Sequence, residues 1–138
     1  MDRTITADEL QAAHRIYLAW DDALGRKNLD DSMKLYTEDA TLESALVRHV
    51  LGTETGIIRG KRDLRDFVRI LYERPLPQRE RFRGELFTDG RVLMWEYPRL
   101  TPTGEQIDLV EVMELKEGLI HRHRVYWGWF GVRALEKA

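Results

Sequence analysis

The sequence of 138 residues contains no cysteine. This excludes disulfides, cysteine metal ligands and thiolate nucleophiles, and it is typical of proteins in a reducing compartment. No stretch approaches the roughly 18 consecutive apolar residues of a membrane-spanning helix. The N-terminal segment 1–9 is polar and lacks the apolar centre of a signal peptide. We therefore expect a cytoplasmic protein that has no membrane partner.

The chain also has little excess charge of either sign, since the net charge is −2 although 33% of the residues are charged. The overall field therefore does not favour nucleic acid as a partner. Nine Lys or Arg residues do fall between Arg59 and Arg83, against four Asp or Glu. The two signs alternate there, and the aromatic spacing that suits stacking on bases is missing. We interpret this segment as a solvated surface and expect no nucleic-acid partner.

Three classes of motif are missing as well. The sequence contains no glycine-rich phosphate loop, no G-x-S-x-G nucleophile elbow and no H-E-x-x-H zinc motif. These motifs would have supported a nucleotide cofactor, a serine hydrolase and a zinc protease. We expect no cofactor and no metal.

Helical periodicity dominates the first half of the chain. Residues Thr6 to Glu9 form a capping box, in which the threonine hydroxyl accepts from an amide of the first turn. The apolar stripe after it predicts one helix that ends at Gly25. A shorter helix is predicted after Asn28, with Leu29, Met33 and Tyr36 facing inward, and another after Gly60. The stripe of the first helix comprises Leu10, Ala13, Tyr17, Trp20 and Leu24.

A period of two dominates the second half. After brief strands at 40–46 and 57–58, it predicts strands near 81–88, 91–97, 106–116 and 119–132. Asp89-Gly90 and Glu117-Gly118 are hairpin turns, so neighbouring strands are expected to be antiparallel. The length suits one domain, 1–138. The sequence thus predicts a single α+β domain, with helices first and a curved antiparallel sheet behind, around an apolar pocket.

Glu111 is the most unusual residue of the predicted sheet. Alternation places it on one face with Ile107, Leu109, Met113 and Leu115. On an inward face this carboxyl group is held where water is scarce, and burial disfavours its charged form. Such a group can act as a general acid or base, or as a neutral donor to a developing oxyanion. We expect Glu111 to face the interior, within hydrogen-bond reach of Tyr17 or His123. The alternative is a solvated glutamate or one that pairs with an arginine.

The last strand carries two histidines on one face. That face holds His121, His123, Val125, Trp127 and Trp129. We interpret it as a pocket wall with a group that titrates near neutral pH. Plain core, or a dimer interface with the histidines at its wet edge, is the alternative. Metal binding by the two histidines lacks a third ligand on the same face, so no metal is expected.

Tyr17 lies on the predicted inward stripe of the first helix. A buried tyrosine hydroxyl needs a partner, and a core residue ordinarily supplies it. A hydroxyl that points into a pocket can instead donate to an oxyanion. His14 is expected at the edge of the same helix, whereas the sequence does not place His49.

The order of elements and three local strings resemble the nuclear transport factor 2-like superfamily. The strings are residues 35–43, 109–113 and 125–127. The superfamily includes ketosteroid isomerases, SnoaL-like polyketide cyclases, scytalone dehydratases and limonene epoxide hydrolases. The resemblance covers nearly the whole chain. It implies a cone-shaped, curved antiparallel sheet wrapped around the N-terminal helices, which is a cystatin-like α+β roll.

The resemblance also implies roles for individual residues. Tyr17 corresponds to the isomerase tyrosine that donates to the substrate oxyanion, and Glu111 to the protonated acid beside it. Ser44 stands where the isomerases have their aspartate base, and serine does not hold a proton near neutral pH. The standard steroid isomerase mechanism is therefore not expected, and His123 becomes the candidate base. The residues expected to line the substrate pocket are Trp20, Ser44, Leu109, Met113 and Trp127.

Three functions remain open, because this fold hosts many activities. The first, which we favour, is a cofactor-free isomerase, cyclase or dehydratase that acts on a hydrophobic carbonyl compound through Tyr17, Glu111 and His123. The second is a module that binds a small apolar molecule without chemistry. The third is a structural dimer. A homodimer through the sheet is also expected, since exposed strand faces are predicted to carry the aromatic residues Trp95, Tyr97 and Tyr126.

Overall fold

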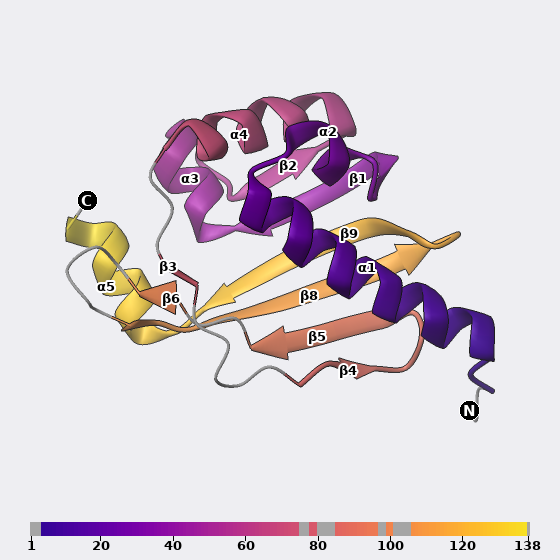
Figure 1. Cartoon of the computed structure of the whole chain (residues 1–138). Coiled ribbons are helices and arrows are strands. Elements are labelled where there is room, and N and C mark those ends of the chain that lie inside the picture. The colour runs from indigo at the N-terminus through magenta and orange to yellow at the C-terminus, as the bar shows by residue number, and fades with distance from the viewer. Residues whose placement is uncertain (1–3, 75–77, 80–84, 97–98, 101–105, 138) are drawn as a thin grey trace.

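The computed structural model describes residues 4–74, 78–79, 85–96, 99–100 and 106–137 of the chain. Four helices, with two strands among them, make up the first half of the chain, strands make up most of the second half, and a last helix follows (Figure 1). The predicted α+β class is confirmed. The described helices are α1 (Ala7–Arg26), α2 (Leu29–Met33), α3 (Ala45–Leu51), α4 (Lys61–Glu73) and α5 (Trp129–Lys137). The described strands are β1 (Tyr36–Ser44), β2 (Ile57–Arg59), β3 (Gln78–Arg79), β4 (Phe87–Thr88), β5 (Val92–Glu96), β6 (Arg99–Leu100), β7 (Gln106–Ile107), β8 (Leu109–Lys116) and β9 (Leu119–Trp127).

The main sheet has six strands in the order β2-β1-β9-β8-β5-β4, and β3, β6 and β7 form a small second sheet. The described pairs are antiparallel except for β1 and β9, which run parallel. The sheet is therefore mixed at that pair rather than wholly antiparallel. Two helices and the rest of the sheet separate β1 from β9 in the sequence, so the chain can return to run beside β1 in the same direction. α1 crosses one face of the curved sheet, over β9, β8 and β5 (Figure 1). We call this face the inner face.

Local signals determine where α1 begins, but not where it ends. Thr6 is the N-cap, and its Oγ1 accepts from the Glu9 amide at 3.1 Å, as a capping box predicts. The predicted end at Gly25 is wrong. The helix continues to Arg26, and Lys27 takes the left-handed conformation with φ 53°. Among the described helices, none combines the length and apolar character of a membrane span.

The buried stripe of α1 differs from the predicted one by one position. Ile16 is fully buried, whereas Tyr17 is only half-buried and Leu10 is 36% exposed. Trp20 is buried as predicted. The helix is therefore rotated slightly, so that Tyr17 lies at the rim of the interface with the sheet.

Two strand predictions end in the wrong place. β1 spans Tyr36–Ser44 rather than 40–46, so Leu46 lies on α3. β9 ends at Trp127, and Trp129 belongs to α5, where it is 66% exposed. Gly131 lets α5 pack closely, because a Cβ there would lie 2.7 Å from Cε3 of Trp127. The predicted strand residues 81–84 and 97 lie outside the described residues.

The two hairpin turns form where they are predicted. Oδ1 of Asp89 accepts from the amides of residues 91 and 92, at 2.9 and 2.8 Å. Gly90 has φ 89°, and residues 117 and 118 also have positive φ. Such backbone conformations match the twist of a tight hairpin. These turns hold β5 and β9 in register with their neighbours.

β5 turns Trp95 toward the inner face, where it is 2% exposed. The prediction that Trp95 lies on an exposed strand face is therefore wrong. Its neighbour Met94 points to the outer face and is 44% exposed. Phe87 and Tyr126 are also exposed, at 60% and 57%, and Tyr126 thus agrees with the prediction. The outer face of the sheet therefore still exposes apolar and aromatic side chains.

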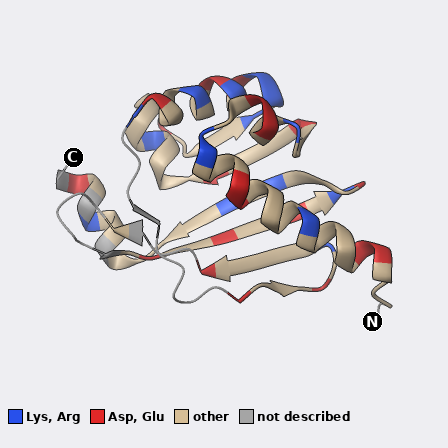
Figure 2. Cartoon of the chain, in the orientation of Figure 1, with Lys and Arg blue, Asp and Glu red and all other residues tan. Residues whose placement is uncertain are grey.

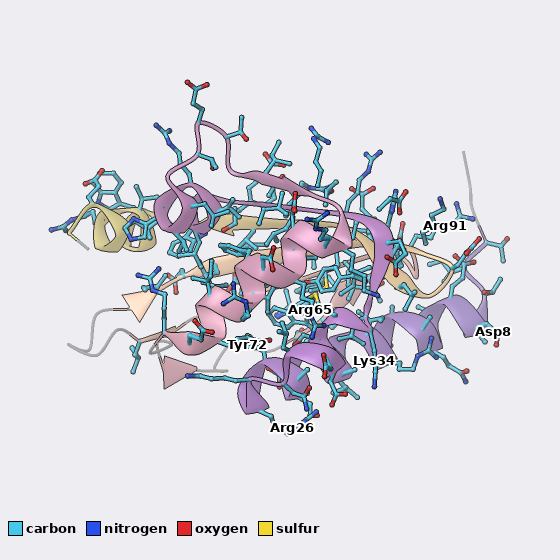
Figure 3. The ribbon with its side chains drawn as sticks, turned by 90° about the horizontal axis from the view of Figure 1, so that it is seen from above. Asp8, Arg26, Lys34, Arg65, Tyr72 and Arg91 are labelled. Atoms are coloured by element: carbon cyan, nitrogen blue, oxygen red, sulfur yellow. The ribbon has the colours of Figure 1, made fainter. Side chains whose placement is uncertain are left out.

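α4 is joined to α2 by polar contacts (Figure 3). Arg65 lies 2.5 Å from Asp30, and the Tyr72 hydroxyl lies 2.7 Å from Oγ of Ser32. Basic and acidic positions are interspersed along α4 (Figure 2), as expected for a solvated surface. Its apolar side chains point the other way, into the core.

Candidate functional site

The strand register brings two rows of side chains together on the inner face. The first row consists of Trp95, Glu111, Val125 and Ser44. The second row consists of Leu93, Met113, His123 and Leu42. Glu111 and His123 are thus diagonal neighbours on adjacent strands, whose Cα atoms are typically about 7–8 Å apart and within reach of long side chains.

Glu111 and His123 form a buried pair. Nε2 of His123 lies 2.5 Å from Oε2 of Glu111, and the two side chains are 4% and 5% exposed. The prediction that Glu111 faces the interior and reaches His123 is confirmed. The alternatives of a solvated glutamate and of an arginine partner are wrong. A hydrogen bond between a ring N–H and a carboxylate is charge-assisted, and such bonds are among the shorter and stronger ones in proteins.

Tyr36 extends this pair into a chain of three. Its hydroxyl lies 2.9 Å from Nδ1 of His123, and it is 4% exposed. Burial, and next the charge of Glu111, raise the pKa of Tyr36 above its usual range. The hydroxyl therefore keeps its proton and remains a hydrogen-bond donor.

The sequence did not point to Tyr36 as a site residue. Its spacing from Leu29 and Met33 placed it on the inward side of the second predicted helix, whereas it is the first residue of β1. Parallel pairing of β1 with β9 sets Tyr36 opposite Ile120, near His123. The inward orientation was correct, but the neighbour across the sheet could not be read from local spacing.

Aromatic rings from α1 close over the pair. Trp20 packs edge-on against His123, with ring centroids 5.9 Å apart, and against Trp95 at 5.5 Å. Tyr17 packs edge-on against Trp95 at 4.9 Å. Tyr36 therefore supplies the hydrogen bond to His123, whereas Tyr17 contacts the ring of Trp95. Its half-buried position puts Tyr17 beside the row that contains Glu111.

The other residues expected to line a pocket have defined positions. Oγ of Ser44 accepts from Nε1 of Trp127 and from the Leu46 amide, both at 3.1 Å. Ser44 therefore caps α3 and holds the Trp127 ring at one end of the site. Leu109 and Met113 are buried on β8, opposite Trp127 and His123 respectively.

The span from Tyr17 to His123 is also the span that matches a known family. A model of the SnoaL-like domain matches residues 17–123. The chain belongs to the SnoaL-like family. It therefore lies in the nuclear transport factor 2-like superfamily, as the sequence resemblance predicts. No curated protein sequence matches the chain.

Solved SnoaL-like and related structures share the fold at low identity. A SnoaL-like protein of unknown function from Burkholderia thailandensis has a TM-score of 0.69 and 15% identity, over 91% of this chain and 99% of that one. A ketosteroid isomerase-like protein from Kribbella flavida has a TM-score of 0.66 and 18% identity, over 86% and 78%. The epoxide hydrolase/cyclase-like enzyme SalBIII, of pyran ring formation in salinomycin, has a TM-score of 0.65 and 22% identity, over 90% and 95%. These likenesses establish the fold.

The other histidines of this SnoaL-like chain lie away from Glu111. A β-bulge displaces His121, which lies 3.2 Å from Oγ1 of Thr37 and 3.3 Å from Asp39. His14 bonds to a carbonyl of its own helix, and His49 lies half-buried on α3. Across the described ranges, no group of three or more His, Cys, Asp or Glu is arranged to hold a metal ion.

A hollow of about 210 Å³ lies apart from the Glu111–His123 pair. Three of its lining residues, Glu96, Val110 and Tyr126, form one cross-strand row on the outer face. Leu109 and Trp127, which were expected to line the substrate pocket, also line this hollow, with Asp108 and Gly128 at the strand ends. Glu111 and His123 do not line it, so an apolar pocket around that pair stays a prediction.

Proposed function

We propose that this protein is an enzyme that needs neither cofactor nor metal, an isomerase, cyclase or dehydratase that moves a proton on a hydrophobic carbonyl compound. The buried Glu111–His123 pair is the observation that carries the proposal. A buried pair of this kind contributes little net stability compared with apolar residues of the same volume. Titratable groups in such surroundings are more common at sites of chemistry.

The surroundings of the pair suit an apolar substrate. Trp20, Trp95 and Met113 present hydrocarbon and ring surface around the two polar side chains. A positioned acid or base contributes roughly 10²- to 10⁴-fold to a proton transfer. In this proposal Glu111 and His123 handle the proton, and Tyr17 at the rim polarises the carbonyl group. Trp20, Ser44, Leu109, Met113 and Trp127 contact or shape the rest of the substrate.

The related structures support the class of reaction. One is described as ketosteroid isomerase-like and another as an epoxide hydrolase/cyclase-like enzyme. This fold carries many activities, so the buried Glu111–His123 pair is the main support, and the related structures add that proton-transfer reactions suit the fold. A module that only binds an apolar molecule is the outcome that the test below distinguishes.

The test is the transfer of solvent deuterium to carbon. We expect the protein in deuterium oxide to exchange the α-protons of at least one member of a panel of cyclic ketones and diketones faster than buffer alone. Mass spectrometry of the recovered compound measures the exchange. Compounds that raise the melting temperature without any exchange would instead identify a binding protein.

We also propose a homodimer that packs through the outer face of the sheet. Phe87, Met94 and Val112 form an apolar cross-strand row there, and the first two are 60% and 44% exposed. Sedimentation is expected to show a dimer, and Met94→Lys to shift it toward monomer, because it places a charge in the row. Leu18→Lys is the matched control, since Leu18 is exposed on α1 instead. A clean wild-type monomer at high micromolar concentration would refute the dimer.

A further inference from the structure

We infer that Glu111 is the catalytic residue that meets the substrate, through Oε1, and that His123 is a positioning residue behind it. The inference rests on the proposed function, and it divides the roles of the two residues within the same site. It also changes the expectation from the sequence, where His123 was the base. The division of roles is the same whichever ring nitrogen of His123 carries a proton.

Both ring nitrogens of His123 are engaged by protein groups. Nδ1 lies 2.9 Å from the Tyr36 hydroxyl, and Nε2 lies 2.5 Å from Oε2 of Glu111. Each imidazole nitrogen makes one hydrogen bond, as a donor or as an acceptor according to the protonation of the ring. The ring therefore has no further hydrogen bond to offer a substrate. A contact with substrate would first break one of these two bonds and leave a buried polar group unpaired, which is unfavourable.

The ring of His123 is also enclosed by aromatic neighbours. Tyr36 stacks on it with ring centroids 6.1 Å apart and an interplanar angle of 27°, and Trp20 meets it edge-on at 5.9 Å. The side chain of His123 is 4% exposed. A ring that is held at both nitrogens and by two neighbouring rings is suited to orienting the carboxylate of Glu111 rather than to reaching a molecule that enters the site.

Glu111 has one carboxylate oxygen in use and one without a protein partner. Oε2 bonds to His123, whereas Oε1 makes no hydrogen bond to any residue that the structure describes, although the side chain is only 5% exposed. A buried carboxylate oxygen of this kind calls for a ligand or a water. The cross-strand neighbours of Glu111, Trp95 and Val125, present ring and hydrocarbon surface. Oε1 is therefore the polar atom that an apolar carbonyl compound would meet.

The proton transfer balances for either position of the proton between His123 and Glu111. The C–H bond next to the substrate carbonyl breaks, its electron pair forms the enolate, and the proton goes to Oε1. If Nε2 carries the shared proton, that proton stays in place. If Oε2 carries it, it moves to Nε2 as Oε1 takes up the new proton, and the ring becomes an imidazolium. Return of the proton from Oε1 to a carbon of the enolate reverses these changes in both cases.

Replacement of His123 by glutamine separates an orienting group from a base. The amide N–H of glutamine can donate to Oε2 of Glu111, but an amide does not take up a proton. With a compound that wild type exchanges, His123→Leu is expected to lower kcat by about 100-fold, and His123→Gln by less than about tenfold, since losses of 10- to 100-fold are typical when an orienting partner is removed. KM is expected to change little in both. His121→Gln, on the same strand, is the matched control and is expected to keep the wild-type kcat.

Two kinetic results would overturn the inference. The first is a folded His123→Gln protein whose kcat falls by about 10²-fold or more, as expected when a base is lost, because His123 would then be the base itself. The second is a His123→Leu protein with the wild-type kcat, because the carboxylate would then need no orienting partner.

A crystal structure of the free protein supplies a readout that does not depend on catalysis. An ordered water is expected within hydrogen-bond distance of Oε1 of Glu111, with both nitrogens of His123 still bonded to Tyr36 and Glu111. A water on either nitrogen of His123, or an Oε1 that has a protein partner or no water, overturns the inference. The expected arrangement in a protein that exchanges no compound supports Oε1 as the free atom of the pair and overturns the proposed function alone.

Discussion

Glu111→Gln is expected to lower the rate of α-proton exchange by about 10²- to 10⁴-fold, because an amide cannot take up a proton. The free energy of unfolding is expected to change by no more than about 1 kcal/mol. The amide oxygen can still accept from Nε2 of His123, and the shape of the side chain is kept. Exchange rates and denaturant unfolding, measured on the same preparation, check the two halves of this result.

Two further variants make the Glu111 result specific. Glu114 lies on the same strand but pairs with Arg124, and this pair is half-buried. Glu114→Gln is therefore expected to leave the exchange rate unchanged. Glu111→Leu removes the acceptor of His123 and is expected to cost roughly 1–3 kcal/mol of stability. A Glu111→Gln protein with wild-type exchange would show that the proton goes elsewhere. A large loss of stability in it would mean that the pair is held together by full charges.

His123→Ala is expected to have the largest effect on stability. It leaves the buried carboxylate of Glu111 without its partner, and breaking a buried pair in this way costs about 3–5 kcal/mol. It also leaves the Tyr36 hydroxyl without an acceptor. Exchange is expected to fall by at least about 10²-fold, with a modest change in the Kd of the ligand. Thermal and denaturant unfolding, with ligand titration, measure these effects.

His121→Ala is the matched control for this variant. His121 lies two residues away on the same strand, its side chain is 24% exposed, and its partners are Thr37 and Asp39. Surface changes of this kind usually stay within about 0.5 kcal/mol. If His123→Ala were as stable and as active as His121→Ala, neither the buried pair nor its role in catalysis would hold.

Alternation in the sequence predicted that both residues of the central pair face inward, because each has apolar neighbours on its own face. Glu111 has apolar residues two positions away on both sides, and His123 is followed by Val125 and Trp127. A period of two is local, so it survives in the sequence even when the partner strand is unknown. The assignment of these residues to the inner face needed no knowledge of the fold beyond that.

The third member of the chain could not be found in the same way. Tyr36 reaches His123 through the parallel pairing of β1 and β9, which are far apart in the sequence. Its local spacing favoured a helix, and the strand begins four residues before the alternation that predicted it. The predicted exposure of Trp95 was wrong for a related reason. A one-residue change of register moves a side chain to the other face, and only pairing with Glu111 on β8 decides its side.

The ends of elements were hard to predict for other reasons. Gly25 is a natural helix terminator, but helix propensity is weak compared with tertiary packing, and α1 continues to Arg26, with Lys27 as its C-cap. At the last strand, Trp129 continued the apolar pattern of Trp127. The turn into α5 depends on Gly131 fitting against the Trp127 ring, a contact that no periodicity reports.

A crystal structure with a compound that the protein exchanges is the sharpest test of Glu111 as the base. The carbon next to the carbonyl is expected to lie about 3–3.5 Å from a carboxylate oxygen of Glu111, the separation of reacting atoms in a productive complex. The carbonyl oxygen is expected to point toward Tyr17, with the His123–Glu111 bond intact. A compound bound only in the hollow at Tyr126, with Glu111 in contact with protein alone, would contradict this role of Glu111.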